Sequence, residues 1–192
     1  MTEQGLQLDN AFWRFSCAVY AGAGVAEACL ELQDRQGCDV NLLLLAVWLG
    51  ACRGVELDGA GLDPAALPAE AGNAWDATVI RRLRDIRRGV KGGGIGDPAL
   101  SGFHRQLLAV ELAAEQIRQA MLFRWAEARF PRGVRGPAPG TARATALARA
   151  NLAVLGGPPA ASRAAGASPP PDSATAALDH LSLAAAACCP EG

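Results

Sequence analysis

A run of arginines, RRLRDIRR, starts at Arg81 and is the strongest candidate binding surface in this 192-residue chain. Residues 81–91 carry five arginines, one lysine and one aspartate, a net charge of +5 along about 15 Å of helix. A helical projection places a basic stripe beside an apolar one, and such a stripe attracts phosphate or an acidic protein surface. The candidate partner- or anion-binding residues are Arg81, Arg84, Arg87, Arg88 and Lys91.

The charge distribution offers a second explanation of the same arginines. Residues 1–80 hold eleven acidic and three basic residues, net −8, and residues 81–192 hold eight acidic and fifteen basic residues, net +7. Because arginine binds carboxylates in a bidentate manner, the stripe is equally explained by internal pairs with Glu31, Asp34 or Asp58. The overall charge of −1 makes nucleic acid an unlikely partner.

A second candidate set lies in the stretch CDVNLLLLAVWLGAC, residues 38–52. Asp39 is placed to cap a helix, and residues 42–49 are apolar on every side, which predicts a central helix surrounded by others. The apolar run is little more than half the roughly 20 residues that cross a bilayer, so we expect no membrane span. Asp39, Asn41 and Trp48 form a candidate pocket, with Arg84 or Arg88 binding an anionic group.

Nothing in the chain forms a recognisable catalytic or metal-binding set. Glu111 and Glu115 lie one helical turn apart, but the ExxH motifs of di-iron bundles are missing, so we interpret the glutamates as helix-surface charge. The chain has two histidines and no serine in an elbow motif. We therefore predict no cofactor and no metal, and favour a non-enzymatic protein.

The six cysteines lack the CxxC or Cys/His spacing of zinc and iron–sulfur sites. We interpret Cys17, Cys29 and Cys52 as small buried hydrophobes, since their neighbours are apolar. The role of the adjacent Cys188 and Cys189 stays open. The sequence also begins without a signal-peptide pattern, which predicts a cytoplasmic protein.

The elements that must position these residues are helices. Hydrophobic residues make up 51% of the chain but aromatic ones only 5%, and alanine and leucine dominate. We predict an all-α bundle of five to six helices with a central buried helix at about 39–52. A flexible N-terminus (1–8) precedes one helical domain (9–155), and a disordered, Pro/Ala-rich tail (156–192) follows. The longest helix, 98–129, is expected to kink or break near residues 101–102.

Three blocks of residues resemble a proteobacterial family of short, cytosolic helical proteins without an assigned function. The first block comprises Phe12, Trp13, Phe15, Tyr20, Gly24, Val25, Ala28, Cys29, Leu30, Leu32, Gln33, Gly37, Asp39, Val40, Asn41, Trp48 and Leu49. The second comprises Trp75, Val79, Leu83, Arg84, Arg87, Arg88 and Lys91, and the third Glu111, Leu112 and Glu115. The resemblance covers roughly residues 10–155. It implies a helical fold and no known activity.

Together these observations favour a non-enzymatic interaction or adaptor protein whose basic stripe meets an acidic partner. The alternative is a small helical enzyme or ligand carrier that binds an anionic molecule near Asp39, Asn41 and Trp48. The sequence leaves the oligomeric state open.

Overall fold

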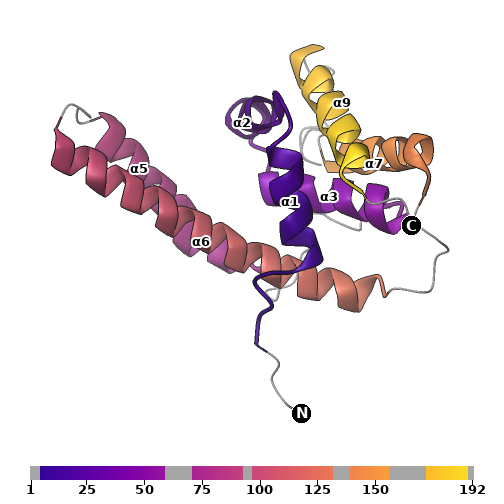
Figure 1. The fold of residues 1–192 in the computed structure, drawn as a ribbon, viewed down its shortest axis with the longest axis horizontal. Coiled ribbons are helices and arrows are strands. Elements are labelled where there is room, and N and C mark those ends of the chain that lie inside the picture. The colour runs from indigo at the N-terminus through magenta and orange to yellow at the C-terminus, as the bar shows by residue number, and fades with distance from the viewer. Residues whose placement is uncertain (1–4, 59–70, 93–96, 132–138, 156–171, 190–192) are drawn as a thin grey trace, which may run out of the picture. The chain divides into compact units, whose positions relative to one another are not determined.

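The structure is a computed structural model that describes residues 5–58, 71–92, 97–131, 139–155 and 172–189. These residues form helices and turns without a strand, which confirms the all-α fold class (Figure 1). The elements are α1 (Ala11–Tyr20), α2 (Val25–Gln36), α3 (Val40–Arg53), α4 (Asn73–Trp75), the π-helical turn η2 (Asp76–Ile80), α5 (Arg81–Gly92), α6 (Pro98–Arg129), α7 (Thr141–Leu155) and α9 (Asp172–Ala187).

The chain divides into two units, whereas the sequence predicts one helical domain over 9–155. The hairpin unit comprises Met1–Trp13 and Leu67–Ala128, and the core unit comprises Arg14–Ala66 and Arg129–Gly192. Helix α1 begins in the first unit and continues in the second. Asn10 caps it, because its Oδ1 accepts a hydrogen bond of 2.8 Å from the backbone N–H of Trp13.

Helix α3 is the centre of the core unit, as the sequence predicts. The Asp39 carboxylate accepts hydrogen bonds from the backbone N–H groups of Asn41 and Leu42, which satisfies donors at the open end of the helix. Every residue from Val40 to Ala51 is buried. The helix ends at Gly54, which adopts the left-handed conformation (φ 63°) that glycine tolerates best.

Helix α7 lies so close to α3 that only glycine fits at the crossing. A Cβ atom on Gly50 would come within 2.8 Å of the Leu147 carbonyl carbon and the Ala148 nitrogen. Near this crossing, Asn151 is fully buried and donates to the carbonyls of Ala46 and Val55 at 3.0 and 2.9 Å. The sequence around Asn151 shows only a modest amphipathic helix, but its packing makes α7 part of the core.

Helix α9 forms within the segment 156–192 that the sequence predicts as a disordered tail. It contacts α2, α7 and α3, and its buried residues include Ala177, Leu181 and Ala185. His180 Nε2 lies 2.7 Å from the carbonyl oxygen of Ala23. The Pro/Ala/Ser-rich composition predicts a segment that buries too little to order itself, but an alanine-rich helix can pack its backbone closely against neighbouring helices. Residues 156–171 and 190–192 lie outside the described residues.

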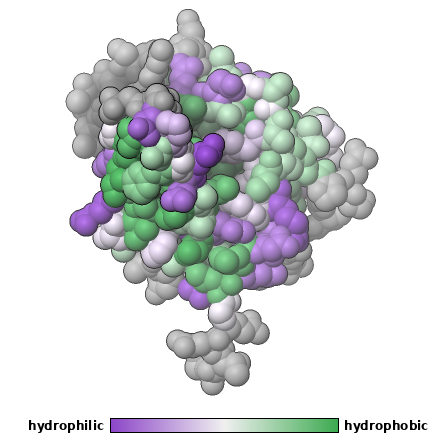
Figure 2. All heavy atoms as spheres, turned by 60° about the vertical axis from the view of Figure 1, so that its left-hand side comes forward, coloured by the Kyte–Doolittle hydropathy of each residue, from purple (hydrophilic) through white to green (hydrophobic). Residues whose placement is uncertain are grey.

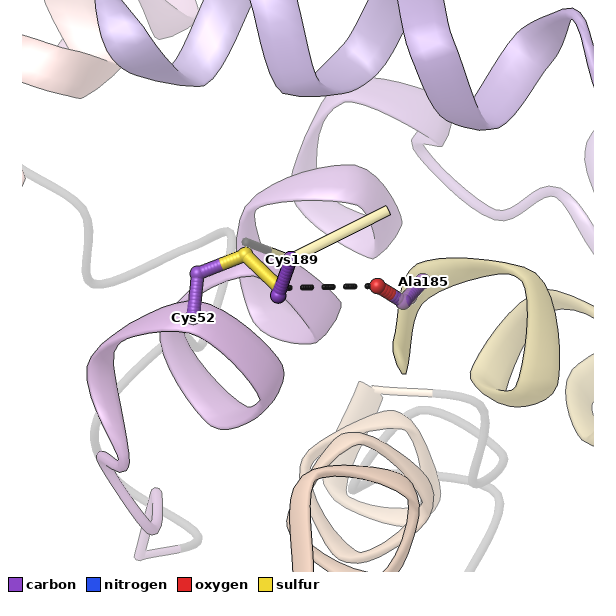
Figure 3. The surroundings of a disulfide bond; sticks show 3 residues. All are labelled: Cys52, Ala185 and Cys189. Atoms are coloured by element: carbon purple, nitrogen blue, oxygen red, sulfur yellow. Dashed lines mark hydrogen bonds between the residues drawn. A yellow bond between two sulfur atoms is a disulfide. The ribbon is translucent and has the colours of Figure 1, made fainter. Parts of the chain in front are cut away.

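A disulfide joins the two chain segments of the core unit. Cys52, in the last turn of α3, is bonded to Cys189 after α9, with the Cα atoms 5.3 Å apart (Figure 3). The expectation that Cys52 is a free buried thiol is therefore wrong. Cys17 is exposed rather than buried, whereas Cys29 is buried as predicted, and Cys188 is half-buried.

In the hairpin unit, α5 and α6 form an antiparallel pair (Figure 1). Helix α6 runs without interruption from Pro98 to Arg129, so the helix does not break near residues 101–102. The space around Gly102 is open, and the helix continues past it. Trp75, before the π-helical turn, donates its indole N–H to the Ala114 carbonyl at 3.0 Å and thereby fixes the start of this segment against α6.

Within the described ranges, no single helix combines the length and apolar character needed to cross a membrane. Only α1 taken together with Val25–Gln33 of α2 reaches that length, and this pair is bent by 102°.

Candidate functional site

Two arginines of the predicted basic stripe form ion pairs inside the α5–α6 hairpin. Arg87 contacts Glu111 with Nε–Oε2 and Nη2–Oε1 distances of 2.5 and 3.2 Å. Arg84 binds Glu115 and also approaches Glu111, with its Nε 3.5 Å from Oε1. The four side chains are only 13–21% exposed. They therefore connect the two helices and are largely withdrawn from solvent.

A second cluster of charges lies at the π-helical turn. The Asp76 side chain is only 6% exposed and accepts from Arg81 Nε at 2.8 Å and from Arg118 Nη1 at 2.9 Å. Arg118 is itself 2% exposed, so its charge is balanced by a carboxylate in a buried setting. Sequence reasoning missed both Asp76 and Arg118, because neither stands out by spacing.

The electrostatics of Arg84 illustrate how the hairpin holds its charges. Burial alone lowers the pKa of a guanidinium, because desolvation penalises the charged form. The charge and hydrogen bond of Glu115, with the charges of Asp76 and Glu111, outweigh this effect and raise the pKa of Arg84 above its ordinary value. Arg84 is therefore a permanent cation held between carboxylates.

These contacts revise both sequence interpretations of the stripe. Internal pairing does occur, but the acids that we see paired with Arg84 and Arg87 are Glu111 and Glu115 of α6 rather than Glu31, Asp34 or Asp58. The interpretation of Glu111 and Glu115 as surface charge is correspondingly wrong, since their side chains are 13% and 17% exposed.

The remaining members of the predicted stripe lie differently. The side chain of Arg81 is 67% exposed although its Nε contacts Asp76. Arg88 is exposed as well, and it takes part in a further interaction. Lys91 belongs to α5, but its side chain lies outside the described residues. The structure thus divides the stripe into an inward pair and an outward pair.

The outward arginines share one side of the hairpin with apolar side chains of α6. Viewed from the N-terminus of each helix, Arg81 and Arg88 lie about 80° clockwise of Arg84 and Arg87, which face α6. Leu108 and Leu112 lie about 60° clockwise of Glu111 and Glu115. The same rotation in antiparallel helices leads to the same side of the pair. We call these four residues the basic face. Leu108 and Leu112 are 43% and 59% exposed.

The opposite rotation, by about 80–100° on average, leads to the other side of the hairpin. Figure 2 turns the left-hand end of Figure 1 forward and shows green hydrophobic residues on the surface there, interspersed with purple hydrophilic ones. We call this side the apolar face. It comprises Leu83, Ile86, Val90, Leu100, Phe103, Leu107 and Val110.

The second candidate set occupies the interior of the core unit. Asp39 is engaged as the cap of α3, and Asn41 and Trp48 are 4% and 2% exposed. The guanidinium of Arg53 lies 5.1 Å from the centroid of a Trp48 ring, and its Nη2 donates to the Phe130 carbonyl at 2.7 Å. These groups serve helix capping and packing.

The candidate pocket with Arg84 or Arg88 as the anion-binding group combines residues that belong to different units. Asp39, Asn41 and Trp48 lie in the core unit, and Arg84 and Arg88 lie in the hairpin unit. The guanidinium of Arg84 is already engaged by two carboxylates. The described part of the chain also contains no group of three or more His, Cys, Asp or Glu side chains able to hold a metal ion.

Comparison with known proteins gives one positive result. Residues 11–122 match the model of a family described as a protein of unknown function (DUF2390). The chain belongs to this family. Comparison with curated proteins found no match, and neither did comparison with solved structures.

The extent of the family match is informative about the two units. It includes α1 to α3 and both sides of the hairpin ion pairs, from Arg84 and Arg87 to Glu111 and Glu115, and it ends before α7 and α9. Several residues that carry the resemblance in the second and third blocks are therefore the ones that hold α5 to α6. Helices α7 and α9, which contact α3 in the core unit, by contrast, lie beyond the matched region.

Proposed function

We propose that this member of the family is a non-enzymatic interaction protein whose basic face binds an acidic partner protein. The observation that carries the proposal is the exposure of Arg81 and Arg88 beside Leu108 and Leu112. Residues 81–91 carry net +5; Glu111 and Glu115 offset two of these charges, and Asp76, which also binds Arg118, contacts Arg81. The surplus positive charge supports recognition of an acidic surface, and the exposed leucines supply apolar contact.

An acidic protein fits this face better than nucleic acid. Nucleic-acid binding is dominated by many lysine and arginine contacts to phosphates, and affinity grows with their number. In the hairpin, Arg84 and Arg87 are committed to glutamates, which reduces the cations directed outward. Leucines between the remaining arginines suit an acidic amphipathic helix, whose apolar side would lie against them.

The alternative function, a small enzyme or carrier with a pocket at Asp39, Asn41 and Trp48, gains no supporting observation. Those side chains cap and fill the core unit. It stays a prediction.

The proposal is tested by capturing partners on the full-length protein and then measuring binding of the purified partner at low and high salt. The decisive variant combines Arg81→Glu with Arg88→Glu. A charge-matched control combines Arg82→Glu with Arg149→Glu, since both arginines are exposed but lie off the basic face. We expect the first variant to weaken binding at least about tenfold and the control to change it by less than about threefold.

Equal loss in both double variants would show that only net charge matters and would overturn the assignment of the face. Capture that disappears after nuclease treatment would replace the acidic protein with nucleic acid. Unchanged binding of the Arg81→Glu, Arg88→Glu variant would remove this surface from consideration.

We also propose that the protein acts in the cytoplasm. The support is its four free cysteines, since proteins of oxidising compartments usually pair theirs. The Cys52–Cys189 bond is then a cross-link that forms or breaks with redox conditions. Acid quenching of cells followed by differential alkylation and mass spectrometry tests this: we expect Cys52 and Cys189 largely reduced in growing cells. Quantitative oxidation of this pair in unstressed cells would place the protein in an oxidising compartment.

A further inference from the structure

Helix α9 is held on the core unit by a covalent bond at its C-terminal end. The N–H of Cys188 donates to the carbonyls of Ala184 and Ala185 at 3.2 Å, so Cys189 directly follows the last turn of the helix. The Cys52–Cys189 bond ties this end to the last turn of α3 (Figure 3). The chain itself joins the opposite end to α7. With the bond intact, α9 is therefore tied at both ends, and without the bond it is tied at one.

The non-covalent contacts of α9 are modest for a helix of 16 residues. Its buried apolar residues are Leu181 and four alanines, and each alanine contributes a single methyl group. Asp179 pairs with Arg149, but both side chains are exposed, so solvent weakens their attraction. Ordering such a helix costs conformational entropy, and an isolated helix of this length is marginal in water. The disulfide therefore supplies a large part of what keeps α9 in place.

The bond lies where it can be opened and formed again. Cys52 and Cys189 are half-buried rather than enclosed in the core, so a thiol reductant can approach them. Cys188 is adjacent to Cys189 but is a free thiol. Burial raises the pKa of Cys188, which lowers the fraction of thiolate able to attack the neighbouring disulfide. The Cys52–Cys189 pairing is therefore protected from exchange with the adjacent thiol.

We propose that α9 is a redox-controlled strap, which the Cys52–Cys189 bond holds against α2, α3 and α7 and which detaches when this bond is reduced. In the reduction, a thiolate of a cellular dithiol attacks one sulfur and forms a mixed disulfide, which the second thiolate of the dithiol then breaks. The products are two protein thiols, which receive the protons of the dithiol, and the oxidised dithiol. Closing the bond requires a two-electron oxidant such as hydrogen peroxide, which takes up the two electrons and the two thiol protons and leaves as two molecules of water.

The strap covers the turn between α1 and α2. His180 Nε2 lies 2.7 Å from the carbonyl oxygen of Ala23, and a Cβ atom on Gly24 would lie 3.2 Å from the same nitrogen. The Ala184 Cβ lies 3.9 Å from the position of a Cβ atom on Gly22. This turn belongs to the region that the family model matches, whereas α9 lies beyond it. Detachment of α9 therefore exposes a surface of the matched region that the oxidised protein keeps covered.

The test is hydrogen–deuterium exchange with mass spectrometry on the full-length protein, in its oxidised form and after reduction with a phosphine. Protection of the α9 amides is compared with protection of the α3 amides in the same sample, so that a general loss of stability cancels. The Cys52→Ser, Cys189→Ser variant represents the open bond without reductant. Cys188→Ser is the matched control, because it removes the adjacent thiol and keeps the bond. Circular dichroism verifies that both variants fold.

In the oxidised protein and the control, we expect the protection of α9 and α3 to agree within about tenfold. After reduction, and in the double variant, protection of α9 should fall at least about a hundredfold below that of α3, because α9 then opens while the core unit stays folded. Similar protection of α9 and α3 in the reduced protein overturns the proposal, since α9 would open only when the whole unit unfolds. Rapid exchange of α9 in the oxidised protein overturns it as well, because the bond would then hold no strap in place.

The use of this strap in the cell rests on the cytoplasmic location proposed above, but the exchange experiment does not. Quantitative oxidation of Cys52 and Cys189 in unstressed cells would remove the location and leave the exchange result unchanged. Failure of the exchange experiment would remove the strap and leave the location unchanged. The basic face lies in the hairpin unit and enters neither measurement.

Discussion

The core unit and the hairpin unit hold their helices together by different means. In the core unit, α3 is buried along its length, and the buried side chains of Asn151 and Ser182 hydrogen-bond to backbone atoms. In the hairpin unit, α5 and α6 are joined by arginine–glutamate pairs, and large apolar side chains remain exposed on the outside.

This difference indicates where function is located. A helix buried on every side has no surface left for recognition, so its residues are explained by packing alone. A hairpin held by charges across its contact line leaves the remaining surface of both helices available. Changes in the core unit should therefore act on stability, and changes on the outer faces of the hairpin should act on binding.

The largest effect should come from closing the space between α3 and α7. Gly50→Val places side-chain atoms where the Leu147 and Ala148 backbones already lie within 3 Å of a Cβ position. Backbones cannot shift cheaply, so we expect a loss of about 4 kcal/mol in the free energy of unfolding. Urea unfolding measures it. The matched change Gly102→Ala, in the open part of α6, should instead stabilise by about 0.5–1 kcal/mol.

Removing the buried amide of the core unit should cost somewhat less. Asn151 Oδ1 accepts from the Leu57 N–H at 2.8 Å, and Nδ2 donates to two carbonyls. Asn151→Ala removes the acceptor of the buried Leu57 N–H and the donor to both carbonyls, and we expect a loss of about 3 kcal/mol. Thr145→Ala on the same helix removes only a hydroxyl bonded to the Thr141 carbonyl and should change stability by less than about 0.5 kcal/mol. Similar losses in both variants would contradict the role given to Asn151.

Reduction of the disulfide should have the next effect. The Cys52–Cys189 bond closes a loop of 137 residues in sequence separation, so opening it releases conformational entropy to the unfolded chain. We expect a loss of about 2 kcal/mol, at the lower end for such bonds, because α9 also packs on α2 and α7. Thermal unfolding with and without reductant measures it. Reductant should leave the Cys52→Ser, Cys189→Ser variant unaffected, and Cys188→Ser should behave like the wild type.

The ion pairs of the two units allow a direct comparison by double-mutant cycles. Arg84 and Glu115 are 18% and 17% exposed, and we expect a coupling energy of about 1 kcal/mol between them. Arg149 and Asp179, which connect α7 to α9, are 56% and 42% exposed, so solvent screens their 2.8 Å contact and the coupling should stay below about 0.5 kcal/mol. A larger coupling at the Arg149–Asp179 pair would reverse the assignment of electrostatic stabilisation to the hairpin.

The smallest effect concerns thiol reactivity. Burial raises the pKa of Cys29 to about 11, although a hydrogen bond from Tyr20 opposes the shift. At pH 8 the Cys29 thiol is therefore almost entirely protonated, and only the thiolate reacts. Burial raises the pKa of Cys17 as well, but Cys17 is exposed. Iodoacetamide at pH 8 should label Cys17 well before Cys29, and equal rates would show that the core unit opens readily.

Much of the fold can be predicted from local sequence patterns, such as helix caps and the spacing of apolar residues. Asp39 before an apolar run predicts a capped central helix, and the cap and the burial of α3 are confirmed. The basic and apolar stripes of 81–91 are likewise visible from helical spacing. Which arginines pair inside the hairpin and which lie on its outer faces could not be predicted from this spacing. The pairing depends on Glu111 and Glu115, which lie 24–31 residues away in the chain.

The sequence by itself determined the helical class, the central helix and the charge on α5, because helix propensity, capping and amphipathic spacing act between residues a few positions apart. Only the tertiary structure decided which arginines are paired, that Cys52 meets Cys189, and that α9 joins the core unit. Those outcomes depend on contacts between segments that are distant in the chain. In such contacts, an alanine-rich helix or a single glycine is needed only because a neighbouring helix packs closely against it.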